Sequence, residues 1–342
     1  MEGLKRCWFP ILPARELGRR PIALRLLGVP LVLFRGPRDE PALLLDRCPH
    51  RLVPLSLGRV ERGELRCAYH GWTFDAGGRC TDVPSLPRHK PTPKVCAPSF
   101  PVRLVGDTLW ATLSEDPYDA EPAGWIDGEV HGSLHVVDLA CDYVRILENL
   151  VDNAHAAFVH RNFLRSYPTQ DIRSVLRETE RGLRVETYGE RARRGLLFRL
   201  WRRVAASDDL EIAHVEEYLE PTAARVTYGD RSGRLHIAVH FLCVPQDAHH
   251  TRLMYRCTVR APLLSRVFLP LLAGNVGRLM VQDRELLEHE AAAAREDGDG
   301  RRGTPTISDV PGVWVARAAR DYAAHGPRPR AQLSTREIAY RL

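Results

Sequence analysis

The two stretches Arg47-Cys48-Pro49-His50-Arg51 and Cys67-Ala68-Tyr69-His70-Gly71-Trp72 decide how this chain folds. Each stretch holds one cysteine and one histidine, spaced Cys-x-His in the first and Cys-x-x-His in the second. Short apolar segments and turns rich in Gly, Pro and Asp surround both stretches. We therefore predict two loops at the tips of adjacent strands in a small all-β domain, with both Cys-His pairs converging on one metal centre.

The donor set identifies the kind of metal centre. Two thiolates on one iron and two imidazoles on the other define a Rieske 2Fe-2S cluster. A structural zinc site would also accept two cysteines and two histidines, but zinc sites usually pair Cys with Cys and His with His within each half. The chain's other cysteines are scattered, so no disulfide framework is expected.

A second candidate site lies in the run from Glu148 to His155, which has a helical pattern. Its predicted apolar face comprises Leu147, Leu150, Val151, Ala154 and Phe158. Asn149, Asp152 and His155 recur at three-residue steps, which predicts a polar stripe beside that face. His160 follows five residues after His155, so both can bind one metal only if the helix ends or bends between them.

A mononuclear non-heme iron that activates dioxygen needs a carboxylate beside two histidines. Asp283 is the predicted carboxylate, because it lies in the middle of an apolar helical stripe and a lone buried carboxylate is costly unless it is paired or binds metal. The stripe is formed by Leu279, Met280, Leu286 and Leu287.

The carboxylate has alternative interpretations. Asp283 would be structural if it formed an ion pair with a buried arginine such as Arg145 or Arg256. Glu288 and Glu290 are further candidates for the ligand on the same helix.

Composition excludes several classes of protein. A 342-residue chain with 44% hydrophobic and 27% charged residues is typical of a globular protein. The net charge is +6, but the arginines between 191 and 203 alternate with apolar residues, and acidic residues lie on either side of this stretch, which indicates a solvated face rather than a nucleic-acid site. The apolar run Val267–Val276 is too short to span a membrane, and no signal peptide is recognised at the N-terminus. A cytoplasmic protein is expected, without nucleic-acid or membrane binding.

The pattern of predicted elements indicates an α+β protein. The N-terminal strands are expected at 22–27, 31–34, 42–45, 64–67, 72–75 and 108–112. Later strands are expected at 210–218, 235–244 and 251–259, and helices at 143–159, 275–294 and 313–324. An acidic stretch rich in Pro and Gly suggests an all-β domain over 1–115, a linker over 116–134 and a catalytic domain over 135–342.

Taken together, these motifs resemble those of the catalytic subunit of the Rieske non-heme iron oxygenases, over about Trp8 to Tyr322 and closest to the short homotrimeric demethylases and hydroxylases. The resemblance implies an all-β Rieske domain followed by a START-like domain, in which an antiparallel sheet wraps a long helix. It assigns the 2Fe-2S cluster to Cys48, His50, Cys67 and His70, and the mononuclear Fe(II) to His155, His160 and Asp283.

The same resemblance implies roles for two neighbouring residues. Asn149 matches a position beside the iron in demethylases. Asp152 matches an aspartate that bridges a cluster histidine of one subunit to an iron-ligating histidine of the next. Because electrons then cross between subunits, a head-to-tail homotrimer is implied.

The implied chemistry is oxygenation of a small molecule. Electrons from NAD(P)H pass through a separate flavin or ferredoxin-type reductase, and dioxygen is used to hydroxylate or demethylate a moderately apolar aromatic, heterocyclic or polycyclic substrate. Arg47, Arg51 and Arg66 flank the cluster loops and are candidates to attract an acidic redox partner. The alternative function is a non-catalytic Rieske electron carrier with a START-like ligand-binding domain.

Two residues depart from the family pattern near the cluster. Leu52 stands where glycine most often follows Cys-Pro-His-Arg, and Ala68 stands where proline usually precedes Tyr-His-Gly. Neither is a ligand, so the expected effect is on loop stiffness and on the hydrogen bonds that tune the cluster.

Overall fold

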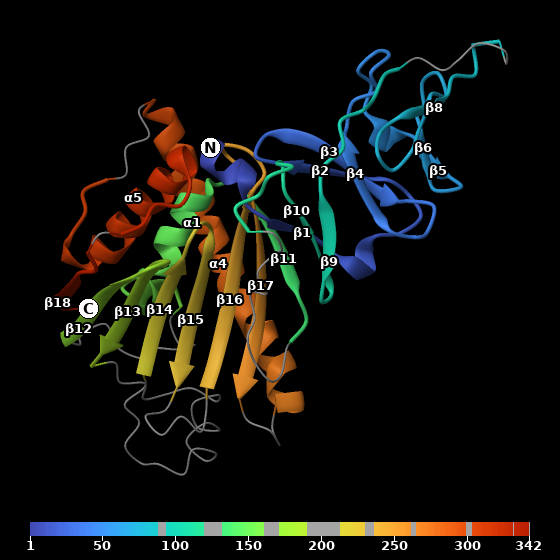
Figure 1. Ribbon diagram of the computed structural model, residues 1–342. Helices are drawn as coiled ribbons and strands as arrows, with labels where there is room; N and C mark the ends of the chain where they lie inside the picture. The colour runs from blue at the N-terminus through green and yellow to red at the C-terminus, as the bar shows by residue number, and fades with distance from the viewer. Residues whose placement is uncertain are drawn as a thin grey trace. The chain divides into compact units, whose positions relative to one another are not determined.

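A computed structural model describes residues 1–87, 94–119, 132–160, 171–189, 213–229, 236–260, 265–298, 303–330 and 332–341 (Figure 1). The chain forms two compact units. The first holds the described residues within 1–124 together with 244–248, and the second holds the rest. Residues 120–131, most of the expected linker, lie outside the described residues, so the exact domain bounds remain a prediction.

The first unit is built from short antiparallel strands. Its strands are β1 (Phe9–Pro13), β2 (Ile22–Leu26), β3 (Val29–Arg35), β4 (Pro41–Leu45), β5 (Arg59–Glu61), β6 (Glu64–Arg66), β7 (Thr73–Phe74), β8 (Cys80–Asp82), β9 (Val102–Val105) and β10 (Thr108–Ala111). Three 3-10 turns accompany them: η1 (Glu2–Arg6), η2 (Ala14–Glu16) and η3 (Leu55–Leu57). The sheets have the orders β1-β10-β9, β2-β3-β4 and β5-β6-β7-β8. The expected all-β character of this region is confirmed.

Cys48 and Cys67 are part of the hydrophobic core of the first unit. Leu44, Leu65 and Phe74 pack in the same cluster and are fully buried. The two cysteines, which follow β4 and β6, are therefore buried among apolar side chains, although both lie in loops.

The second unit is an eight-stranded sheet with the order β11-β17-β16-β15-β14-β13-β12-β18. Its strands are β11 (His135–Leu139), β12 (Asp171–Thr179), β13 (Gly182–Tyr188), β14 (Ala213–Leu219), β15 (Ala223–Gly229), β16 (His236–Pro245), β17 (Thr251–Arg260) and β18 (Thr335–Arg341). Every strand pair for which a register is described is antiparallel. The α+β class is confirmed, whereas β11, β12, β13, β15 and β18 were not predicted from the sequence.

Helices cover one face of this sheet (Figure 1). The helical elements are α1 (Tyr143–Leu150), α2 (Ala156–Val159), α4 (Ser265–Glu296), η4 (Ile307–Asp309) and α5 (Val310–His325). Among them, α1 packs on β15, α4 on β17 and α5 on β13. No helix in the described ranges combines the length and apolar character needed to cross a membrane.

The predicted helix over 143–159 is wrong in one respect. The side chain of Asp142 caps α1 by accepting a hydrogen bond from the backbone N–H of Arg145, and the helix ends at Leu150 rather than continuing. A separate short helix, α2, follows at Ala156. The expected polar stripe of Asn149, Asp152 and His155 therefore does not exist as one helical face.

Two residues expected in apolar stripes are exposed. Phe158 is 52% exposed because it belongs to the separate helix α2, and Leu286 is also 52% exposed. In the middle of α4 the buried positions are instead Val276, Met280, Asp283 and Leu287. Their spacing of three and four residues forms a narrow buried seam that leaves Leu286 outside it.

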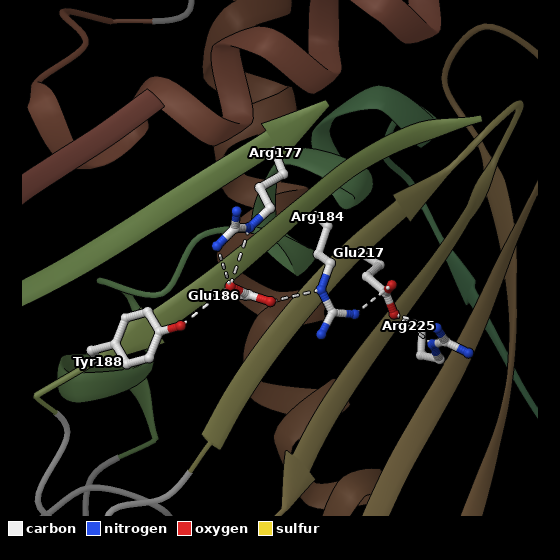
Figure 2. Close-up of polar contacts among 6 residues, drawn as sticks. All are labelled: Arg177, Arg184, Glu186, Tyr188, Glu217 and Arg225. Atoms are coloured by element: carbon white, nitrogen blue, oxygen red, sulfur yellow. Dashed lines mark hydrogen bonds and ion pairs between the residues drawn. The ribbon is translucent and has the colours of Figure 1, made fainter. Parts of the chain in front are cut away.

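The opposite face of the sheet carries a network of ion pairs between neighbouring strands (Figure 2). Its members are Arg177, Arg184, Glu186, Tyr188, Glu217 and Arg225. The arginines between 191 and 203 lie outside the described residues. Within this network, Arg177, Arg184 and Arg225 are matched by glutamates on the same or the adjacent strand, as expected for a solvated face.

Candidate functional site

The first group of predicted ligands lies in two loops of the first unit that share one hydrogen-bonding pattern. In the loop after β4, the N–H of Cys48 donates to the carbonyl of Val53, and the N–H of Leu52 donates to the carbonyl of Cys48. In the loop after β6, Cys67 is bonded in the same way to Trp72 and Gly71. Each loop thus returns on itself around its Cys-His pair, as the sequence predicted.

The four donors form a buried sulfur pair and an exposed imidazole pair. Cys48 and Cys67 are 2% and 3% exposed, and their thiols are within hydrogen-bonding reach. The rings of His50 and His70 are both exposed, with centroids 4.6 Å apart. The ring of His50 also stacks on Trp72 at 4.8 Å and 7°. This separation of two thiols from two imidazoles fits a Rieske cluster, in which each pair holds one iron.

The electrostatics of this group depend on burial and on neighbouring cations. Burial raises the pKa of the Cys48 thiol to about 11, because a thiolate is poorly solvated there. Desolvation and the nearby His70 and Arg51 lower the pKa of His50, which favours the neutral imidazole. The neutral imidazole has a lone pair available for iron. The buried thiol would lose its proton when it binds the metal.

The second group of predicted ligands comes together in the second unit. Three potential ligand atoms lie within 4.8 Å of one another, one each from His155, His160 and Asp283. His155 immediately precedes α2, His160 immediately follows it, and Asp283 comes from the middle of α4. The short helix α2 and its end at His160 provide the change of direction that the five-residue spacing requires.

Both imidazole rings are oriented by hydrogen bonds at Nδ1. Nδ1 of His155 lies 2.6 Å from the backbone carbonyl of Asp152, and Nδ1 of His160 lies 2.9 Å from Oε1 of Gln282. A carbonyl oxygen can only accept, so each ring donates from Nδ1. The opposite nitrogens, Nε2 of His155 and of His160, lie 3.6 Å and 3.1 Å from Oδ1 of Asp283.

This arrangement leaves a buried carboxylate oxygen without a proton donor. Asp283 is 5% exposed, and its Oδ1 accepts no hydrogen bond in the structure. Since neutral rings protonated at Nδ1 present lone pairs at Nε2, three electron-pair donors face one another. A cation between them would compensate all three, and two histidines with one carboxylate are the donor set of mononuclear non-heme iron. The residues present therefore fit the ion that the sequence predicted.

Charge around His155 also favours a cation at this position. Burial opposes protonation of the ring, but the Asp152 and Asp283 carboxylates outweigh it and raise the pKa of His155. Arg145, one of the predicted structural partners of Asp283, pairs instead with Asp142 and Glu290.

The other two predicted site residues lie beside this group rather than in it. Asn149 is in the last turn of α1, and its backbone carbonyl accepts a hydrogen bond from the N–H of Asp152. Asp152 uses Oδ1 to accept from the N–H of Ala154, and its Oδ2 is 3.5 Å from Nδ1 of His155. Asp152 thus shapes the turn between α1 and α2 and orients the first histidine.

Gln282 is a site residue that the sequence analysis quoted but gave no role. Its only signal in the sequence is its position immediately before the candidate carboxylate. A second unpredicted feature is the buried pair His214 and Glu216, whose Nε2 and Oε1 atoms are 3.3 Å apart. Both are almost fully buried, and His214 stacks on Tyr228.

Two family models match the parts of the chain that hold these two groups of residues. Residues 7–101 match the model of the Rieske [2Fe-2S] domain, and residues 139–323 match that of the vanillate O-demethylase oxygenase C-terminal domain. The first match favours the iron–sulfur interpretation of the Cys-His pairs over zinc.

Individual relatives point the same way. Chlorophyllide a oxygenase of Chlamydomonas reinhardtii is 28% identical over 306 residues, covering 83% of this chain and 44% of the relative. The oxygenase component of chloroacetanilide N-alkylformylase from Rhizorhabdus wittichii is 33% identical over 210 residues, which is 58% of each protein. The chain thus spans about half the length of the curated relatives it matches.

A solved structure shows the same fold. The crystal structure of dicamba monooxygenase bound to dicamba superposes with a TM-score of 0.77 and 20% sequence identity. The superposition covers 94% of this chain and 98% of that one.

Proposed function

Because the chain belongs to the Rieske non-heme iron oxygenases and matches the vanillate O-demethylase oxygenase C-terminal domain over more than half its length, we propose that it is a terminal oxygenase that hydroxylates or demethylates a small molecule. The proposed substrate is a moderately apolar aromatic, heterocyclic or polycyclic compound. In a monooxygenation, substrate, one dioxygen, two electrons and two protons give the oxygenated product and one water.

The observation that carries this proposal is the convergence of His155, His160 and Asp283. Their ligand atoms lie close together, and Oδ1 of Asp283 is buried without a proton donor. A non-catalytic Rieske electron carrier would have no use for a costly buried carboxylate opposite two oriented imidazoles. This convergence therefore supports the oxygenase over the carrier.

The proposed ligands form two separate metal sites. We assign the 2Fe-2S cluster to Cys48, His50, Cys67 and His70, and the mononuclear iron to His155, His160 and Asp283. When bound, a ferrous ion held by three protein ligands supplies open coordination positions for dioxygen. The protein keeps both imidazoles oriented and excludes water from a buried carboxylate. The proposed domains are 1–115 and 135–342, joined by the linker 116–134.

The proposal includes partners. Relatives named as oxygenase components support a separate reductase, which would deliver electrons from NAD(P)H to the cluster. A cytoplasmic location, where that nucleotide is available, is part of the same proposal. We also propose a homotrimer, in which Asp152 links the iron site of one subunit to the cluster of the next, and Asn149 lies beside the iron.

Metal analysis tests the proposal directly. Purified protein should contain about three irons per chain, two in the cluster and one mononuclear. The His155→Ala variant should lose one iron, keep the visible absorbance of the cluster and lose substrate oxidation. A variant that still oxidised substrate at the wild-type rate would contradict the proposed site. A colourless wild-type protein would contradict the cluster.

Product analysis then defines the reaction. The protein, a surrogate reductase and a panel of aromatic and heterocyclic compounds would be incubated under labelled dioxygen. Label in a hydroxyl group of the product supports hydroxylation, and loss of a methyl group as formaldehyde supports demethylation. Asp152→Asn should leave the iron content unchanged and slow electron transfer if the bridging role is correct.

A further inference from the structure

Gln282 contacts the metal-binding group through its side chain. It lies one residue before Asp283 on α4, and its Oε1 is 2.9 Å from Nδ1 of His160. The same turn of α4 therefore supplies the carboxylate on one side of the His160 ring and an amide acceptor on the other. The two contacts are made at opposite nitrogens of a ring that is only 4% exposed.

The contact with the amide oxygen of Gln282 favours the tautomer of His160 that carries its proton on Nδ1. A neutral imidazole has one protonated nitrogen and one lone pair. With Gln282 accepting at Nδ1, the lone pair is on Nε2, 3.1 Å from Oδ1 of Asp283. In the other tautomer, Nε2 would carry the proton and donate it to Oδ1 at that distance.

The two tautomers have opposite consequences for metal binding. When Nδ1 is protonated, Nε2 and Oδ1 are both free to bind a cation. When Nε2 is protonated, a hydrogen bond between His160 and Asp283 satisfies both atoms, and a metal must break it. The acceptor at Nδ1 therefore determines whether the ring and the carboxylate form a metal site or a closed pair.

The two histidines differ in how this is achieved. Nδ1 of His155 is held by the backbone carbonyl of Asp152, which no side-chain substitution removes. Nδ1 of His160 is held by the uncharged amide of Gln282. A neutral acceptor fixes the ring with less increase in ligand basicity than a carboxylate would cause.

We propose that Gln282 is a positioning residue that holds His160 in its metal-binding tautomer and sets the donor strength of Nε2. The inference rests on the proposed function, because it concerns the same iron site. Gln282 acts through His160 and does not touch the metal or the substrate.

Metal titration of two variants tests this role. Gln282→Leu removes the acceptor, and Gln282→Glu keeps an acceptor oxygen but adds charge. Val281→Ala is the matched control, because Val281 is adjacent on α4 and 64% exposed. Protein with an intact cluster and an emptied mononuclear site would be titrated with Fe(II) under anaerobic conditions and, separately, with Co(II).

Gln282→Leu should bind both ions about 10- to 100-fold more weakly than the wild type, as found when partners of ligating histidines are removed. Gln282→Glu should bind within about threefold of the wild type or more tightly, and should lower the Fe(III)/Fe(II) potential of the mononuclear iron. The control should match the wild type. If Gln282 had only a structural role, Gln282→Glu would not both retain metal affinity and lower the Fe(III)/Fe(II) potential.

Three results would overturn the inference. Binding by Gln282→Leu within twofold of the wild type would exclude an effect on His160, and equal weakness of Gln282→Glu would exclude the acceptor role. If the wild-type protein takes up no ion outside its cluster, the proposed function fails and this inference fails with it. Gln282→Met, which keeps the side-chain length, replaces the leucine variant if the latter loses the visible absorbance of its cluster.

Discussion

Leu52 and Gly71 occupy the same position in the two cluster loops, four residues after Cys48 and Cys67, and both have left-handed backbones with φ of 61° and 73°. Both donate a backbone hydrogen bond to the carbonyl of their loop's cysteine. Glycine adopts this conformation freely, whereas a leucine with a Cβ is strained in it. The departure of Leu52 from the family's glycine therefore stores strain beside the cluster.

Leu52→Gly should stabilise the first unit by about 1 kcal/mol, because relief of the left-handed strain exceeds the entropy cost of glycine. Little packing is lost, since Leu52 is 67% exposed. The measurement is the temperature at which the visible absorbance of the cluster disappears on heating. Leu57→Gly is the control: Leu57 is equally exposed, without a positive φ. A lower temperature for Leu52→Gly would show that the leucine side chain stabilises the loop.

The reverse substitution, Gly71→Ala, should destabilise the cluster loop by about 1 to 2 kcal/mol. A Cβ at this position would lie 3.0 Å from Cγ of Pro84 and 3.2 Å from the guanidinium of Arg66, in addition to the backbone strain. Faster loss of the cluster at a fixed temperature is the expected observation. Unchanged cluster lifetime would contradict the strain argument at both positions.

Arg47 and Arg51 should accelerate electron transfer from an acidic redox partner. Both are exposed beside the cluster loop, whereas Arg66 pairs with Glu61. Replacing both by glutamine should slow reduction of the cluster about tenfold at low salt and flatten its dependence on ionic strength. Stopped-flow absorbance with an acidic ferredoxin-type reductant measures this rate. Arg38→Gln, in the turn between β3 and β4, is the control, and salt-independent reduction of the wild type would contradict the prediction.

Arg145 should stabilise the second unit by linking α1 to α4. Its side chain is 6% exposed and pairs with Asp142, 28% exposed, and with Glu290, 51% exposed. Arg145→Met keeps the apolar stem but removes the buried charge that pairs with Asp142, and should cost about 2 kcal/mol once solvent screening of Glu290 is considered. Chemical denaturation followed by tryptophan fluorescence measures the loss. Glu290→Gln should cost less, because that carboxylate is half exposed.

Glu186 should make the stability of the second unit depend on acid pH. Burial opposes its ionisation, but the hydrogen bond and charge of Arg184, with help from Arg177, outweigh it and lower the pKa from its ordinary value of 4.5 (Figure 2). Protons therefore bind the unfolded chain more readily. The stabilisation is fully present above about pH 4.5 and is lost as pH falls through the lowered folded-state pKa.

The measurement is the difference in melting temperature between the wild type and Glu186→Gln across pH. The variant should be less stable by about 0.5 kcal/mol near neutral pH, and the difference should vanish in acid. Glu115→Gln, an exposed position in the first unit, is the control. A difference that stayed constant below pH 4.5 would show that Glu186 acts through packing rather than charge.

Local sequence specifies the proposed cluster ligands almost completely. Each Cys-His pair lies within one short loop, so the spacing of Cys48 and His50, or of Cys67 and His70, already constrains both donors. The surrounding alternation of apolar residues and turns predicted the strands on either side. No distant residue is needed to bring the members of either pair together.

The mononuclear site was only partly accessible from sequence. Residue types predicted His155, His160 and Asp283, but a helical period led to a single helix over 143–159, which is wrong. Helical periodicity cannot show where a helix stops when apolar residues continue, and Asp142 capping with termination at Leu150 became evident only in three dimensions. The same limit explains why Leu286 was wrongly predicted to be buried, because its exposure depends on how α4 is rotated against its neighbours.

The sequence by itself determined which metal-binding donors this protein offers: two Cys-His pairs, two further histidines and one carboxylate in an apolar helix. Tertiary structure alone decided that Asp283 meets His155 and His160, that both rings donate from Nδ1, and that Gln282 is the acceptor for one of them. The physical reason is that donor identity is a property of each residue. Distance and proton position depend instead on the packing of α2 against α4, whose residues are far apart in the chain.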